Sequence, residues 1–306
     1  MHIALKYLKI ILNRSIIFYL LCSFLIWHWL DYHALVNNAI PQTMSRLTPP
    51  IDYFDDFISK QNNYDRFKLM DCIYYHKAVA KYFPFQKAES LGMMGFCYER
   101  LGQKQLAIDA YKQSIASNPD YFWPYYDLGV IFYNQNQYSK AAEYFQNAAE
   151  EDPVKTIVLL SRSKVYNDVR LSDGTGSYNV IQSIKEGQKQ AMILMMESLN
   201  KLGLYDQLLA VAINGIKQGT DDEGIFYYYA AVAAYYQKYY PQSLRFLQIS
   251  LQANANNPDA YLYMGMGLKM VGQEGPAQLF IQRASLMNKQ GISTLKKYLN
   301  PQVRFF

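Results

Sequence analysis

The residue types that perform most enzyme chemistry are sparse in this chain. Of its 4 histidines, His33 and His76 follow the N-terminal apolar run, and no metal-ligand cluster accompanies them. The Gly174-Thr175-Gly176 segment has neither the preceding strand nor the following Lys of a phosphate-binding loop, so it predicts a turn. The sequence therefore predicts no catalytic residue, no metal site and no cofactor, and it favours a binding protein over an enzyme.

An internal repeat predicts the elements that would position a binding surface. Two segments superimpose residue for residue at a spacing of 34. Each predicts two helices with small residues where the helices cross, large apolar residues between the turns, and a Pro that ends the second helix. One pair cannot bury its apolar face alone, so several must stack. The matched positions are Met94, Gly95, Tyr98, Gly102, Ala107, Tyr111 and Pro119 in the first segment, and Leu128, Gly129, Phe132, Asn136, Ala141, Phe145 and Pro153 in the second.

This pattern resembles the tetratricopeptide repeat (TPR). The resemblance covers Ile51 to Lys289 and implies an all-α fold, a right-handed superhelical solenoid of antiparallel helix pairs. The units 51–87 and 156–188 are degenerate, and 156–188 has a long predicted turn at residues 172–177. The unit 189–222 is a looser match that lacks the terminal Pro. The predicted units are 51–87 (degenerate), 88–121, 122–155, 156–188 (degenerate), 189–222, 224–257 and 258–291, followed by a C-terminal cap or tail at 292–306.

The composition agrees with an ordered helical protein. Hydrophobic residues make up 51% of the chain and charged residues 18%, which supplies enough apolar side chains for a continuous core and argues against disorder. The net charge of +5 is spread along 306 residues rather than clustered. A nucleic-acid partner is therefore not expected.

The N-terminus carries a second pattern. Lys6, Lys9 and Arg14 precede residues 16–30, which have no formally charged side chain. The charge asymmetry and the nearby aromatic residues favour an uncleaved single-pass anchor with its N-terminus in the cytoplasm. A cleaved signal peptide and a helix parallel to the membrane remain alternatives. The predicted segments are a cytoplasmic N-terminus at 1–14, a transmembrane anchor at 15–36 and a connecting segment at 37–50, with the repeats outside the cytoplasm, in the periplasm of a bacterium.

Three cysteines bear on the compartment. Cys22 lies in the predicted anchor, whereas Cys72 and Cys97 lie on what should be consecutive helices of the repeat region. Antiparallel packing would allow Cys72 and Cys97 to form a disulfide in an oxidising compartment. Buried unpaired cysteines are also ordinary in helical cores, so both states remain open.

Aromatic side chains supply the candidate binding surface. The chain has 29 Tyr, of which many occupy positions that the repeat pattern assigns to the core and others do not. The resemblance implies that positions 5, 9, 12 and 13 of each first helix line a concave groove, where rigid aromatic rings suit the recognition of an extended peptide or a helix. The alternative is that these rings pack as additional core. The predicted partner-binding residues are Phe96, Tyr126, Val130, Tyr133, Tyr228, Val232, Tyr235, Tyr236, Leu262 and Met266.

One well-known use of such repeats is not supported. Adaptors that grip a chaperone C-terminal carboxylate carry Lys and Asn where this chain has Gly92, Phe96 and Asp127. The sequence instead predicts a membrane-anchored scaffold that binds a protein or peptide partner during assembly of an envelope complex, with a small-molecule ligand not expected. A permanent structural subunit of a large membrane-associated complex, or an accessory protein of glycan synthesis or export, remains an alternative.

Overall fold

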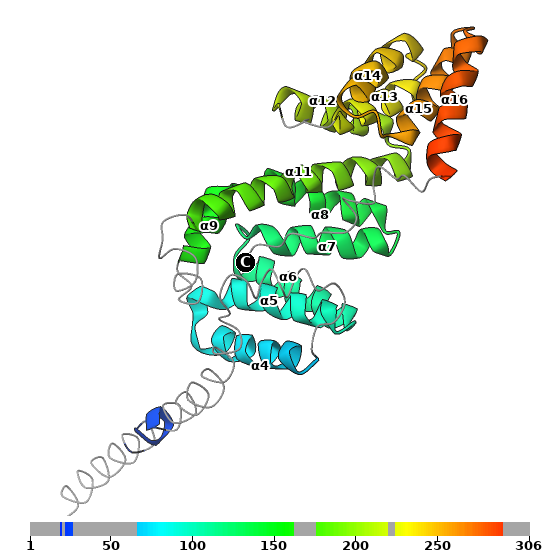
Figure 1. The fold of residues 1–306 in the computed structure, drawn as a ribbon. Helices are drawn as coiled ribbons and strands as arrows, with labels where there is room; N and C mark the ends of the chain where they lie inside the picture. The colour runs from blue at the N-terminus through cyan, green and yellow to red at the C-terminus, as the bar shows by residue number, and fades with distance from the viewer. Residues whose placement is uncertain (1–18, 20–21, 27–65, 162–175, 220–223, 290–306) are drawn as a thin grey trace, which may run out of the picture.

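The computed structural model describes residues 19, 22–26, 66–161, 176–219 and 224–289 of the chain. Within these ranges the regular structure is helical and contains no strand, which confirms the predicted all-α class. Figure 1 shows helices that follow one another along an extended array. From the N-terminal side they are α4 (Arg66–Tyr82), the short 3-10 helix η1 (Pro84–Gln86), α5 (Lys87–Arg100), α6 (Lys104–Ser117), α7 (Phe122–Asn134), α8 (Tyr138–Glu150), α9 (Pro153–Ser161), α11 (Gly176–Leu202), α12 (Tyr205–Lys217), α13 (Ile225–Tyr236), α14 (Tyr240–Ala253), α15 (Pro258–Met270) and α16 (Glu274–Lys289).

Small residues bring the two helices of a pair into close contact. A Cβ atom at Gly129 of α7 would lie 2.6 Å from the ring of Phe145 on α8, and Phe145 is fully buried. Gly95 of α5 meets the ring of Tyr111 on α6 at the same distance, one repeat earlier. Two large rings therefore fill the space that two missing side chains leave, as the repeat pattern predicts.

The turns inside the pairs share one backbone conformation. One or two residues after the end of each first helix, a residue has a positive φ, which reverses the chain so that the second helix can begin two residues later. Two of these residues are not glycine, with φ of 58° at Asn136 and 65° at Lys238. The turn is therefore set by the surrounding helices as well as by residue type. The five positions are Gly102, Asn136, Gly203, Lys238 and Gly272.

The region between residues 153 and 202 departs from the predicted units. The boundary expected at residues 188 and 189 does not exist, because α11 runs uninterrupted for 27 residues. No Pro occurs at this boundary, and Gly187 costs a helix about 1 kcal/mol where a Pro would cost about 3 kcal/mol. Figure 1 shows α11 running past α7 and α8 toward the helices of the C-terminal half.

Polar contacts fix α11 against the preceding unit. The Gln188 side-chain amide donates to the backbone carbonyl of Ala149 near the end of α8, at 3.2 Å. One residue earlier, a Cβ on Gly187 would lie 2.7 Å from the ring of Phe122, so the glycine allows a close approach to α7. Helix α11 thus packs on the pair formed by α7 and α8, mainly through α8, and α9 also contacts α11.

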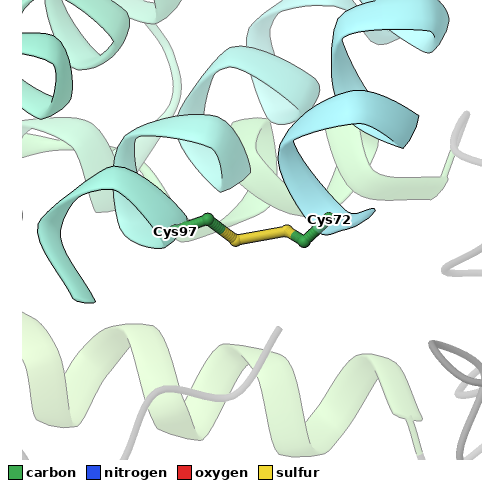
Figure 2. Close-up of a disulfide and its surroundings, with 2 residues drawn as sticks. All are labelled: Cys72 and Cys97. Carbon is green, nitrogen blue, oxygen red and sulfur yellow. A yellow bond between two sulfur atoms is a disulfide. The ribbon is translucent and has the colours of Figure 1, made fainter. Parts of the chain in front are cut away.

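A disulfide joins α4 to α5. Cys72 of α4 and Cys97 of α5 are bonded, with their Cα atoms 6.8 Å apart (Figure 2). Both cysteines are almost fully buried, in an apolar cluster with Leu69, Leu91 and other side chains. The bond therefore ties α4 to the repeat that starts at α5.

The segments predicted around the membrane lie largely outside the described residues. Of the predicted anchor at 15–36, only Tyr19 and residues 22–26 are described, and the segments 1–14, 37–50 and 292–306 are not. The described part of the chain contains no helix whose length and hydropathy suit a membrane span.

Candidate functional site

The structure divides the ten predicted groove residues into a covered and an accessible group. Five are at most 8% exposed, because neighbouring helices pack over them, and at these positions the groove prediction is corrected. The other five retain solvent access, and Tyr236 is 45% exposed. The buried residues are Phe96, Tyr126, Val130, Tyr228 and Val232, and the accessible ones are Tyr133, Tyr235, Tyr236, Leu262 and Met266.

Tyr126 illustrates why the N-terminal half of the groove is closed. Its ring lies 5.8 Å from that of Phe122 and 6.1 Å from that of Phe145, measured between centroids. Its hydroxyl group donates a hydrogen bond to the side chain of Gln190 on α11, at 3.1 Å. Because α11 stacks on this unit, Tyr126 serves as a contact between repeats.

A group of tyrosine rings, several of them accessible, lies in the C-terminal half on α12, α13 and α15. The rings of Tyr205 and Tyr236 are stacked, with centroids 4.2 Å apart and an interplanar angle of 9°. The Tyr263 hydroxyl donates to the Tyr236 hydroxyl at 3.3 Å, and the Tyr263 ring lies 5.6 Å from that of Tyr235. Tyr228 extends the group inward, with its ring 6.1 Å from that of Tyr263. We refer to Tyr205, Tyr228, Tyr235, Tyr236 and Tyr263 as the tyrosine cluster.

Two carboxylates lie next to the tyrosine cluster. Glu197 of α11 is only 3% exposed, accepts a hydrogen bond from the Tyr229 hydroxyl at 3.0 Å, and pairs with Lys201 at 3.2 Å. Asp259, in the first turn of α15, is partly buried. Burial raises the pKa of Asp259, the negative charge of Glu197 raises it further, and Lys201 partly offsets this. The charges of Asp259 and Glu197 therefore interact, and both carboxylates are at least partly shielded from solvent.

The same environment keeps the tyrosine hydroxyl groups protonated. Burial is the main cause that raises the pKa of Tyr228, Tyr229 and Tyr263, and nearby carboxylates or tyrosines raise it further. The pKa of Tyr133 on α7 is also raised, by burial and then by Glu197. These hydroxyl groups thus remain hydrogen-bond donors and acceptors at physiological pH, and Tyr133 belongs to the same electrostatic environment.

Several residues of this surface were not predicted from the sequence. Glu197 occupies position 9 of its unit, one of the positions that the resemblance assigns to the groove, so the repeat register contained a signal for it. Tyr263 and Asp259 occupy positions 6 and 2 of theirs, where the repeat pattern gave no such signal. Tyr263 and Asp259 lie near the groove residues of α13 because α13 and α15 pack against each other.

A second surface feature follows α12. A shallow depression of about 420 Å³ is open to solvent along one side of this helix. Its lining includes the apolar Leu209 and Ile213, and also Gln237, which donates a hydrogen bond of 2.7 Å to Asp206. Neither this depression nor the tyrosine cluster contains a metal-binding arrangement, since the described ranges hold no group of three or more His, Cys, Asp or Glu side chains that could bind an ion.

Comparisons with known proteins identify the repeats in the N-terminal half. The family described as TPR repeat matches residues 98–136, and the family described as tetratricopeptide repeat matches residues 123–153. Tetratricopeptide repeat protein 6 of Homo sapiens is 37% identical over 76 residues, which is 25% of this chain and 15% of the human protein. The chain therefore matches a small part of that relative.

Solved structures of low sequence identity were also found. MamA (41-end) from Desulfovibrio magneticus RS-1 is 13% identical, with 68% of this chain and 98% of that chain covered and a TM-score of 0.47. A tetratricopeptide repeat protein from Parabacteroides merdae ATCC 43184 is 17% identical, with 84% and 99% covered and a TM-score of 0.35. The TPR2AB domain of yeast Sti1, solved in a complex with pHSP90, is 12% identical, with 82% and 97% covered and a TM-score of 0.30.

Proposed function

We propose that this chain, a tetratricopeptide-repeat protein, is a scaffold that binds a protein or peptide partner through its tyrosine cluster. TPR folds are suited to protein–protein interaction, and the observation that supports this particular surface is the group of accessible rings on α12, α13 and α15. Tyrosine combines a large apolar area with a polar tip and only a few rotatable bonds, so it contributes contact area at low entropic cost.

The accessible neighbours extend this surface. Leu262 and Met266 lie on α15, next to Tyr263, and both are partly exposed. Apolar side chains beside hydroxyl groups suit a partner that presents an extended strand or one face of a helix. Because Phe96, Tyr126 and Val130 are buried, the proposed partner binds the C-terminal half of the array.

We further propose that an N-terminal segment anchors this scaffold in a membrane. Residues 16–30 without formal charge, preceded by Lys6, Lys9 and Arg14, support a single-pass anchor whose N-terminus is cytoplasmic. The repeats would then lie outside the cytoplasm, in the periplasm of a bacterium, and act in assembly of an envelope complex. The disulfide between Cys72 and Cys97 supports an oxidising compartment.

A second candidate function is a permanent structural subunit. Large apolar side chains on the last described helix favour it, since Leu279 is 68% exposed and Leu286 is 55% exposed. Such a subunit would need its partners to remain soluble, whereas a scaffold should persist alone. Size-exclusion chromatography of the full-length chain in mild detergent distinguishes them: a discrete monomer or small oligomer supports the scaffold, and aggregation supports the subunit.

The proposed surface is tested by replacing one ring of the tyrosine cluster, Tyr235, together with the partly exposed Tyr133 of α7. Tyr133→Ala combined with Tyr235→Ala should abolish co-purification of the partner from crosslinked membranes, while the circular dichroism spectrum keeps its helical form. Leu279→Ala, at an exposed position on α16, is the matched control and should leave co-purification intact. Unchanged co-purification with the double variant would refute the assignment of this surface.

A further inference from the structure

We infer that the tyrosine cluster, together with Asp259 and Glu197, accepts a basic side chain, Lys or Arg, from a peptide partner. The inference rests on the proposed function and adds the chemical class of the partner. It starts from the convergence of three helices. Glu197 on α11 contacts α13 through Tyr229, and Tyr228 of α13 contacts α15 through Tyr263.

The charged side chains near the tyrosine cluster, Glu197, Asp259 and Lys201, do not sum to zero charge. Glu197 is already satisfied, because Tyr229 donates to one carboxylate oxygen and Lys201 pairs with the other. Within the described ranges, Asp259 forms no side-chain hydrogen bond or ion pair, although this side chain is partly buried. Two carboxylates and one ammonium group leave one net negative charge, which a cation from a partner would neutralise.

The rings of the tyrosine cluster also favour a cationic ligand. The faces of tyrosine rings attract a nearby ammonium or guanidinium group, and their protonated hydroxyl oxygens accept hydrogen bonds from it. Tyr263 lies four residues after Asp259 on α15, which places the two side chains on the same helix face, and its hydroxyl group lies 3.3 Å from that of Tyr236. An anionic ligand would instead meet two carboxylates that are at least partly shielded from solvent, which costs free energy.

A simpler explanation covers only part of these observations. Asp259 lies in the first turn of α15, where the helix dipole stabilises a negative charge. That role does not require the helix to bring Asp259 within the field of a second buried carboxylate, Glu197. It also does not require a surrounding layer of tyrosine rings. A preference for basic ligands separates the two explanations.

The net positive charge of the chain helps to distinguish a specific basic-residue site from non-specific electrostatic attraction. At +5 the protein as a whole attracts acidic peptides, so non-specific electrostatics work against a basic preference. A random 12-residue peptide library displayed on phage and selected on the full-length chain is therefore an informative probe. We expect selected peptides to be enriched in Lys or Arg, and we expect Asp259→Asn to remove that enrichment.

Affinity measurements locate the contact. For one selected peptide, Asp259→Asn should weaken binding about tenfold, and replacing the peptide's basic residue by Gln should do the same with no further loss in the variant. Asp109→Asn, on the exposed side of α6, is the control and should leave the affinity unchanged. Circular dichroism of each variant checks that the helices are retained.

The outcomes separate this inference from the proposed function. Selected peptides without a basic preference, or a preference that survives Asp259→Asn, would overturn the basic-side-chain site while leaving the peptide-binding surface in place. If the selection enriches no peptide over a blank surface, the proposed function fails and the inference fails with it.

Discussion

Adding one methyl group at Gly129 tests the helix packing on which the array depends. The new Cβ would lie 2.6 Å from two carbon atoms of the Phe145 ring, closer than side chains tolerate. Overpacking of this kind costs about 1–3 kcal/mol. In a helix interior, Gly→Ala gains about 1 kcal/mol through propensity. We therefore expect Gly129→Ala to lower the free energy of unfolding by about 1 kcal/mol.

The origin of this loss is tested by removing the ring. In a Phe145→Ala background the clash is gone, so Gly129→Ala should stabilise the protein by about 1 kcal/mol, giving a coupling of about 2 kcal/mol between the two sites. Gly267→Ala is the control, because its nearest neighbour is the rotatable end of Leu244 at 3.0 Å. Chemical denaturation followed by circular dichroism measures the unaltered protein and the four variants. If Gly129→Ala stabilises the unaltered protein as Gly267→Ala does, the close approach of α7 and α8 is refuted.

Three further predictions concern the N-terminal helices and the buried carboxylate. Breaking the disulfide between Cys72 and Cys97, 25 residues apart, should lower the free energy of unfolding by about 3 kcal/mol, because the unfolded chain regains the entropy of an open loop. Denaturation with and without reductant measures this effect, and equal midpoints would contradict it. Burial lowers the pKa of His76 to about 4 from 6.5, so the unfolded chain binds the proton first and stability should fall as the pH drops from about 6.5 to about 4, by up to about 3 kcal/mol. Denaturation at pH 7 and pH 4.5 should therefore differ less in His76→Gln, and an equal difference would assign the pH effect to other groups. Tyr229→Phe should destabilise the protein by about 1–3 kcal/mol, since the buried Glu197 loses a hydrogen-bond donor; an unchanged denaturation midpoint would argue against this bond.

The repeat pattern contained most of the information about the helices. The small residues Gly95 and Gly129, with Tyr111 and Phe145 opposite them, predict close packing within each helix pair. The structure places these contacts where the spacing of 34 residues implies. The merging of two predicted helices into α11 follows from the absence of a strong helix breaker near Gly187. A sequence pattern defined by Pro gives no boundary where Pro is missing.

The candidate site was less accessible to sequence reasoning. A position within a repeat indicates the direction in which a side chain points, but not whether the next repeat covers it. Tyr126 and Tyr236 occupy groove positions in different units, yet the first is buried beneath α11 and the second is exposed. The proximity of Glu197 to Asp259 depends on how three helices from three units pack, which no single repeat encodes.

The central claim, that a partner binds the tyrosine cluster, is tested most directly by site-specific photocrosslinking in cells. A photoreactive amino acid is placed at Tyr236 or at Met266 on the proposed surface, and at Leu279 on the exposed side of α16 as a control. We predict a discrete crosslinked adduct at the first two positions, lost when Tyr235→Ala is added, and none at Leu279. Adducts that form only at Leu279, or equally at all three positions, would contradict the account.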